Sequence, residues 1–296
     1  MKVKVFSLFL FISVSNSTFP QGISTSSKLP RVSYKLDGEH LMASSEKILY
    51  KTTPQRKLYF YILRPEAKRK KASSAIIYFS GGGWIQQSVA AQIPTAAWFR
   101  DQGIIAICAE YRVKNADGTT PLECIKDAKS AVRYVRANAK RLGVDASKII
   151  VAGGSAGAHI ALCTQMDDGD EAGEDRSISS KPNALVLHNP VLGEGYGKDF
   201  FTLHPEFSPL LQAKNTWPPM VLSCGTADKT TPYIYAQQFE RLMISVGNTC
   251  KLITVKDADH GCDWPVSNPN FLPVITEMTK FLKKEKFLPN SKIRVK

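Results

Sequence analysis

Residues 148–160 read KIIVAGGSAGAHI, and this stretch decides the fold of the chain. Residues 149–152 form an apolar run rich in β-branched side chains that is typical of a buried strand, and an apolar helical pattern follows the last glycine. Between them lies a Gly-x-Ser-x-Gly pentapeptide from Gly153 to Gly157. In this context the motif predicts a strained turn that lifts the serine hydroxyl above the end of the sheet, and glycines at both ends let strand and helix approach closely. We therefore predict Ser155 as a nucleophile.

Similar apolar runs recur along the chain and alternate with helical patterns. The runs lie at 75–79, 104–109, 148–152, 184–188, 220–223 and 251–255, and the helical patterns at 122–141, 155–165, 233–246 and 270–284. This alternation predicts a mostly parallel sheet with helices on both faces. Two alternating runs at 47–51 and 57–63 predict an antiparallel pair at its edge. We expect one α/β domain with about eight strands and no internal repeat.

A glycine-rich turn follows the expected strand at 75–79 and reads SGGGW at residues 80–84. Ligands of such sheets bind at the carboxyl ends of the strands, so this turn lies on the same face as the serine. Glycines leave backbone N–H groups free to face an anion. We predict that the N–H groups of Gly82, Gly83 and Ala156 form an oxyanion hole. The glycines are not followed by Lys-Ser/Thr, which excludes a P-loop.

A serine nucleophile needs a histidine base and an orienting carboxylate, and both are found after later strands. Asp228 follows one expected strand, and His260 follows the last one. We predict these two as the acid and the base. Asp257 and Asp259 compete with Asp228, but they lie too close to the histidine along the loop to reach its far ring nitrogen.

The segment 189–218 also follows a strand and is expected to form a short cap over this face. It is rich in aromatic residues, which suit a pocket wall or the packing of the cap onto the body. His159, one turn into the helix after the serine, is expected to be a buried structural residue. A cap of this size favours short acyl groups such as acetyl. The residues that we expect in the substrate pocket are Trp84, His188, Tyr196, Phe201 and Trp217.

Four motifs occur in a characteristic order: SGGGW at 80–84, GGSAG at 153–157, GTAD at 225–228 and HG at 260–261. Together they resemble the hormone-sensitive-lipase-like carboxylesterases of the α/β-hydrolase superfamily. They are similar above all to secreted bacterial carbohydrate esterases of the acetylxylan and feruloyl type. The resemblance covers nearly all of 45–285 and implies the α/β-hydrolase fold, no cofactor, and ester hydrolysis through an acyl-enzyme. The chain departs from the family pattern at Ser80, where a histidine is usual; a serine can still hydrogen-bond the loop.

The N-terminal residues indicate export. Lys2 and Lys4 precede an apolar run at 5–14 and then small residues, which predicts a signal peptide cleaved after Ser17 and a secreted or periplasmic protein. That run is too short for a stable membrane anchor, and no later stretch is long and apolar enough to be one. The expected organisation is a signal peptide at 1–17, a linker at 18–44, the catalytic domain at 45–288 and a basic tail at 289–296.

The formal net charge is +13, but the basic residues are scattered apart from 68–71 and 280–296. No nucleic-acid motif accompanies them, so we expect no nucleic-acid partner, whereas attraction to an acidic polysaccharide stays open. The acidic stretch 167–175 is interpreted as a solvated loop. Metal-ligand spacing is absent, so no metal is expected. Cys108 and Cys163 lie in apolar patterns and are expected to be buried, and a Cys224–Cys262 disulfide stays open.

The sequence thus predicts a serine esterase that removes short acyl groups, acetyl above all, from a small ester or an acetylated polysaccharide. A general carboxylesterase or lipase and a feruloyl esterase are the main alternatives. A peptidase of this fold usually carries a large additional domain, for which the chain has no room. A non-catalytic binding protein usually lacks one of the three predicted catalytic residues. Acyl transfer differs from hydrolysis only in the acceptor, so the sequence leaves it open.

Overall fold

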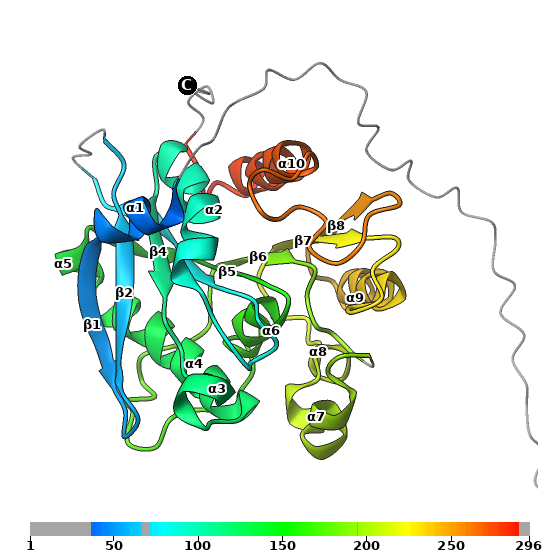
Figure 1. Cartoon of the computed structure of the whole chain (residues 1–296), viewed down its shortest axis with the longest axis horizontal. Helices are drawn as coiled ribbons and strands as arrows, with labels where there is room; N and C mark the ends of the chain where they lie inside the picture. The colour runs from blue at the N-terminus through cyan, green and yellow to red at the C-terminus, as the bar shows by residue number, and fades with distance from the viewer. Residues whose placement is uncertain (1–36, 67–70, 194, 290–296) are drawn as a thin grey trace, which may run out of the picture.

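Eight strands form one sheet in the computed structural model, which describes residues 37–66, 71–193 and 195–289 (Figure 1). The strand order is β1-β2-β4-β3-β5-β6-β7-β8. β1 pairs with β2 and β2 with β4 in antiparallel fashion, and every other pairing is parallel. The predicted fold class and antiparallel edge are therefore confirmed. The strands are β1 Glu46–Thr52, β2 Lys57–Leu63, β3 Ser73–Phe79, β4 Ile105–Ala109, β5 Val144–Gly154, β6 Ala184–His188, β7 Met220–Gly225 and β8 Cys250–Val255.

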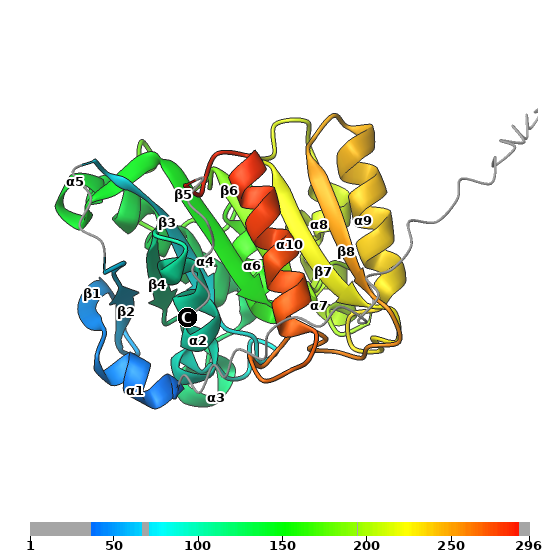
Figure 2. The same ribbon diagram turned by 90° about the horizontal axis from the view of Figure 1, so that it is seen from above.

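Helices cover both faces of this sheet, which explains why its central strands are apolar throughout. Helices α2 (Val89–Asp101) and α10 (Phe271–Lys284) lie on one face, and α4 (Pro121–Ala137), α6 (Ala156–Cys163) and α9 (Tyr233–Ser245) lie on the other (Figures 1 and 2). Each face has its own hydrophobic core cluster. The remaining short helices are α1 Gly38–Ala43, α3 Lys114–Asp117, α5 Ala139–Leu142, α7 Lys198–Leu203, the 3-10 helix η1 Pro205–Phe207 and α8 Pro209–Gln212.

Helix α2 was not predicted from the sequence. Most of its residues are buried, so it lacks the polar face that gives an amphipathic helix its period. Pro94 lies inside it, which further hides the helical pattern. Its start is fixed by Ser88, whose Oγ accepts a hydrogen bond from the N–H of Ala91 at 3.1 Å. This helix matters for function because it borders the active-site cavity described below.

The expected linker ends in helix α1. Asp37 caps this helix through the N–H of Glu39, and Leu41 is buried in the same core cluster as α2. The approach is close, because a Cβ on Gly38 would lie 1.9 Å from the carbonyl oxygen of Ala90. The folded body therefore begins earlier than residue 45. The expected signal peptide, the rest of the linker, residues 68–70 of the basic region and nearly all of the basic tail lie outside the described residues.

The acidic stretch at 167–175 is not the solvated loop that we expected. Asp170 forms ion pairs with Lys129 and Arg133 of α4 at 2.9 and 2.7 Å, and Glu171 pairs with Arg112 at 2.8 Å. The side chain of Lys129 is only 1% exposed, so it needs a carboxylate partner, which the acidic loop provides. The loop is acidic because it packs against buried cations.

All six cysteines are free thiols, which rules against the Cys224–Cys262 disulfide. Both of these residues, like Cys108 and Cys163, are buried as small apolar side chains.

In the described part of the chain, no helix is long and apolar enough to cross a membrane. Over the same residues, no group of His, Cys, Asp and Glu side chains could hold a metal ion.

Candidate active site

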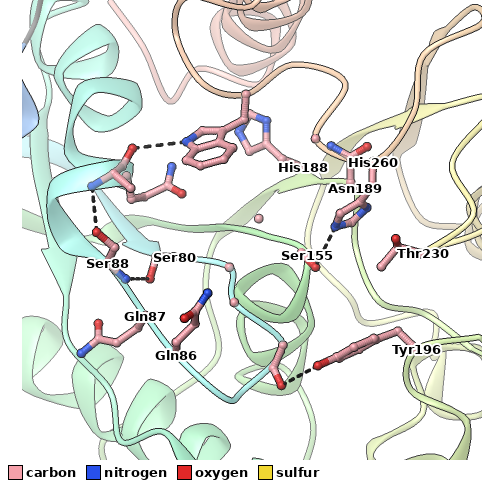
Figure 3. Close-up of a pocket in the computed structure, with 18 residues that line it drawn as sticks. Ser80, Gln86, Gln87, Ser88, Ser155, His188, Asn189, Tyr196, Thr230 and His260 are labelled. Carbon is pink, nitrogen blue, oxygen red and sulfur yellow. Dashed lines mark hydrogen bonds between the residues drawn. The ribbon is translucent and has the colours of Figure 1, made fainter. Parts of the chain in front are cut away.

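A cavity of about 500 Å³ opens at the carboxyl ends of the central strands (Figure 3). Its wall comes from the loop after β3, the turn between β5 and α6, the end of β6, the cap, and the loops after β7 and β8. Ser155 and His260 both line it, as do the glycines at 81–83. The loops that follow the strands therefore lie on one face of the sheet, as the sequence analysis predicts.

Ser155 occupies a strained turn between β5 and α6. Its backbone has φ 52° and ψ −118°, a conformation that non-glycine residues rarely adopt. The turn is held by a hydrogen bond from the N–H of Ser155 to the carbonyl oxygen of His188 at 2.8 Å. A Cβ on Gly157 would lie 2.3 Å from the carbonyl oxygen of Phe79, so only glycine permits this packing of α6 on β3. The turn directs the serine side chain into the cavity.

His260 lies between the serine and a carboxylate. Its Nε2 is 3.1 Å from Oγ of Ser155, and its Nδ1 is 2.8 Å from Oδ2 of Asp228 (Figure 3 shows the first contact). The three residues come from three different loops, yet their side chains form one continuous hydrogen-bonded chain. A proton on Nδ1 of His260 would donate to Asp228, which leaves Nε2 free to accept the proton of the serine hydroxyl.

Asp228 is held as a carboxylate acceptor. Its Oδ1 accepts the N–H groups of Thr230 and Thr231 at 2.9 and 2.8 Å, and its Oδ2 accepts the hydroxyl of Thr231 at 2.8 Å. Burial alone would raise the pKa of Asp228, but the hydrogen bonds from His260 and Thr231 outweigh it and lower the pKa below its usual value. The carboxyl group is therefore ionised and can stabilise a protonated imidazole.

The two competing carboxylates do not reach the imidazole of His260. Oδ1 of Asp259 accepts the backbone N–H of His260 at 2.8 Å, so it caps the turn. The side chain of Asp257 is 83% exposed and points into solvent. His159 is fully buried, and its Nε2–H donates to the carbonyl oxygen of Phe207 at 3.0 Å. Burial lowers the pKa of His159 to about 4, so the residue is neutral and structural.

The glycine turn after β3 presents free backbone donors to the cavity. Gly82 and Gly83 adopt φ values of 127° and 62°, and no described residue accepts a hydrogen bond from their N–H groups. Ala156 is the first residue of α6, so its N–H has no partner within the helix. Oγ of Ser80 accepts the N–H of Ser88 at 3.1 Å. The serine at this position thus braces the turn.

The five expected pocket residues divide into two groups. His188 and Tyr196 line the cavity. Trp84, Phe201 and Trp217 do not, which corrects the expectation. The ring of Trp84 packs on His159, with 5.2 Å between ring centroids; Phe201 also packs on His159, and Trp217 packs on Phe239. These three rings fasten the cap and the glycine turn to the body, because burying aromatic area stabilises the fold.

Several residues that line the cavity are not predicted from the sequence. Gln86 and Gln87 follow the glycine turn, Gln92 lies in α2, and Trp264 lies in the loop after β8. Trp264 is 44% exposed, and its Nε1–H donates to the carbonyl oxygen of Ala91 at 3.2 Å. The rule that loops after strands share one face could have indicated Trp264 and the first two glutamines. Gln92 gave no signal, because its helix was not recognised.

Comparisons with known proteins agree with this architecture. Residues 61–185 match the BD-FAE family. The structure is similar to that of the native esterase Est2 from the planctomycete Thermogutta terrifontis, with a TM-score of 0.79 and 34% identity over 85% of this chain and 96% of that chain. The butyrate-bound form of the same esterase matches with a TM-score of 0.78 and 35% identity, over 85% and 98% of the two chains.

Curated relatives are more distant. A probable isoprenylcysteine alpha-carbonyl methylesterase of Oryza sativa subsp. japonica is 25% identical over 72% of this chain and 57% of its own length. An acetylxylan esterase of Xylanibacter ruminicola is 25% identical over 61% of this chain and 39% of its own. The chain spans about half the length of the curated relatives that it matches first. From the fold and the similarity over nearly the whole length of a solved esterase, we conclude that the chain belongs to the α/β-hydrolase esterases, enzymes that hydrolyse carboxylic esters.

Proposed function

We propose that this protein hydrolyses esters of short carboxylic acids through an acyl-enzyme on Ser155. The observation that carries the proposal is the continuous hydrogen-bonded chain from Ser155 through His260 to Asp228 at the wall of a cavity. This arrangement matches the needs of acyl transfer: a nucleophile, a base within reach of its proton, and a carboxylate that fixes the tautomer of the base.

The chemistry follows from these contacts. Oγ of Ser155 attacks the carbonyl carbon of the ester while its proton passes to Nε2 of His260. The tetrahedral intermediate collapses, the bond to the alcohol oxygen breaks, and His260 returns the proton to the departing alcohol. Water then attacks the acyl-enzyme, with His260 again as the base. The acid is released and the serine hydroxyl is restored.

The glycine turn supplies the electrostatic part of the mechanism. The tetrahedral intermediate carries a negative oxygen, which the N–H groups of Gly82, Gly83 and Ala156 would receive. Donors of this kind are oriented before the reaction begins, and each typically contributes about 100- to 1,000-fold to the rate. The hydrogen bonds that brace the turn, from Ser88 to Ser80 and from Tyr196 to the carbonyl oxygen of Gly83, support this role.

The substrate that we propose carries a short acyl group on a hydroxyl-rich alcohol. Solved forms of the related Thermogutta terrifontis esterase are described as propionate-bound and butyrate-bound, which supports a short acyl group. Gln86, Gln87 and Gln92 add amide groups to the wall of the cavity, and Trp264 adds an exposed ring. Amides can hydrogen-bond sugar hydroxyls, and an indole can stack on a sugar ring. An acetylxylan esterase among the relatives favours the same class.

We also propose that the protein is exported, on the basis of the basic, apolar and small residues that precede position 18. Large polymers such as acetylated polysaccharides cannot be imported intact, so export and this substrate class agree. N-terminal sequencing of the protein from the medium or periplasm of its own host tests this point. Recovery of a chain that begins at residue 18 would support it, and recovery only from the cytoplasm with residue 1 intact would refute it.

The activity is tested with p-nitrophenyl esters of increasing chain length and with acetate release from acetylated xylan. We expect fast cleavage of the acetyl ester, a decline towards the octanoyl ester, and acetate release from the polymer. Ser155→Ala serves as the control that should remove all turnover. Rising activity on long chains with none on the polymer would exclude the carbohydrate substrate, and full activity of Ser155→Ala would exclude the mechanism.

A further inference from the structure

A second histidine–aspartate pair lies beside the cavity, and the mechanism proposed above makes no use of it. Nδ1 of His188 is 2.6 Å from Oδ2 of Asp263, and the two side chains are only 7% and 1% exposed. The other ring nitrogen of His188 is 3.2 Å from the hydroxyl of Tyr78. His188 lines the cavity, whereas Asp263 lies behind it (Figure 3 shows His188 near the loop of His260).

Asp263 is a buried carboxylate with donors on both oxygens. Besides His188, its Oδ2 accepts the hydroxyl of Ser223 at 2.7 Å, and its Oδ1 accepts the side-chain amide of Asn189 at 3.1 Å. Burial alone would raise the pKa of Asp263, but the electrostatic interaction with His188 and the hydrogen bonds from His188 and Ser223 outweigh it and keep the pKa below its usual value. Burial of a carboxylate without hydrogen-bond donors would lower the stability of the fold, and these donors offset that cost for Asp263.

Asp263 links the loop that carries His260 to the central sheet. Asp263 lies three residues after His260, in the loop between β8 and α10. Its donors lie at the carboxyl ends of two neighbouring strands, β6 and β7, and in the residue after β6. The carboxylate therefore ties the loop of the base to the central sheet.

The same strand end also holds the nucleophile. The carbonyl oxygen of His188 accepts the backbone N–H of Ser155 at 2.8 Å, while its imidazole contacts Asp263. One residue thus connects the serine turn with the loop of the base. The two attachments lie on either side of the contact between Oγ of Ser155 and Nε2 of His260, which is 3.1 Å long.

We propose that Asp263, through His188 and Ser223, is a positioning residue that sets His260 within reach of Ser155. This inference rests on the proposed function. Asp263 touches neither the cavity nor the three residues of the hydrogen-bonded chain, so it acts only by placing the loop. Displacement of a reacting group by about 1 Å typically costs about 100-fold in rate.

Asp263→Asn tests this proposal, because it keeps the size of the side chain and removes one acceptor atom. His188 and Ser223 share Oδ2, whereas Asn189 donates to Oδ1. The single oxygen of the amide cannot accept from all three donors, so the loop loses at least one attachment. We expect kcat for p-nitrophenyl acetate to fall about 100-fold with KM nearly unchanged. Ser223→Ala removes one donor only and should lower kcat about five-fold. All rates are measured well below the melting temperatures and are normalised to the folded fraction from circular dichroism.

Asp127→Asn is the matched control. Asp127 is also a fully buried carboxylate with several donors, namely the backbone and guanidinium of Arg112 and the ammonium of Lys51. None of these residues lines the cavity. A purely structural role predicts that all three variants lower the melting temperature and leave kcat of the folded protein unchanged. Positioning predicts that kcat falls in the two variants near His260 and not in the control.

Each outcome decides the question. A folded Asp263→Asn protein with kcat within two-fold of the wild type overturns the inference. If that variant does not fold, an unchanged kcat of Ser223→Ala overturns it instead. An inactive wild type, or an active Ser155→Ala, would overturn the proposed function and this inference with it. An active wild type that is insensitive to these changes would overturn this inference alone.

Discussion

Replacing Asp228 by asparagine should leave the fold intact and nearly abolish esterase activity. The reason lies in the orientation that the structure imposes on the new amide. Oδ1 of Asp228 accepts two backbone N–H groups, from Thr230 and Thr231, at 2.9 and 2.8 Å. An asparagine must keep its oxygen at that position, so its NH₂ group takes the place of Oδ2, 2.8 Å from Nδ1 of His260.

This amide reverses the tautomer of the base. Its N–H donates to Nδ1 of His260, so the proton of the imidazole moves to Nε2, which faces Oγ of Ser155 at 3.1 Å. A protonated Nε2 cannot accept the proton of the serine hydroxyl. A wrong tautomer of this kind costs about 10,000-fold in kcat, or about 5 kcal/mol of transition-state stabilisation.

The assay is steady-state hydrolysis of p-nitrophenyl acetate by wild type, Asp228→Asn and Asp257→Asn. Asp257 lies on the same loop as His260, and its exposed side chain makes it the matched control, with unchanged kcat expected. Thermal melts establish that both variants are folded. A loss of less than ten-fold in Asp228→Asn, or an equal loss in Asp257→Asn, would refute the assignment of the orienting acid.

Three further predictions concern the turn, the cap and a buried histidine. Gly83→Ala places a Cβ 2.0 Å from the hydroxyl of Tyr196 in a backbone with φ 62°. We expect at least a ten-fold loss of kcat in the same assay, and a normal kcat would rule out a role for this turn. Tyr196→Phe removes the hydrogen bond to the carbonyl oxygen of Gly83 at 3.1 Å and should lower kcat only a few-fold, a result that a complete loss would contradict. Burial lowers the pKa of His159 from 6.5 to about 4, so on acidification its imidazole is protonated in the unfolded chain before it is protonated in the folded protein. The stability that the neutral imidazole contributes is therefore present above pH 6.5 and is lost as the pH falls towards 4. Urea unfolding at pH 7 and pH 4 measures how much the free energy of unfolding decreases between these two pH values. We expect this decrease to be about 3 kcal/mol smaller in His159→Gln than in the wild type. Equal decreases in the two proteins would contradict the neutral, buried state of the imidazole.

Much of the architecture could be predicted from the sequence because its causes are local. The run 148–152 and the pentapeptide after it identify a buried strand, a tight turn and a helix, since each depends on neighbouring residues. Once the strands are recognised, the carboxyl-end rule places Asp228 and His260 on the face of Ser155. The structure brings these three side chains within hydrogen-bonding distance.

Other features follow only from contacts between distant segments. Helix α2 has no amphipathic pattern, because both the sheet and α1 cover it. The aromatic residue at 84 packs on His159 rather than lining the cavity, and no local pattern distinguishes these two environments. The interpretation of the acidic loop as solvated is wrong because its cationic partners lie in other parts of the chain, which no local pattern reveals.

The sequence by itself determined the fold class, the turn of Ser155 and the order of the candidate catalytic residues, because periodicity, glycine content and motif spacing are properties of contiguous chain. The tertiary structure alone decided which rings line the cavity and which carboxylates hold the loop of the base. His188 and Asp263 are separated by 75 positions, and no local pattern around either residue indicates that they pair. Their contact exists because the sheet brings the end of β6 against the loop after β8, and a hydrogen bond depends on distance in space rather than along the chain.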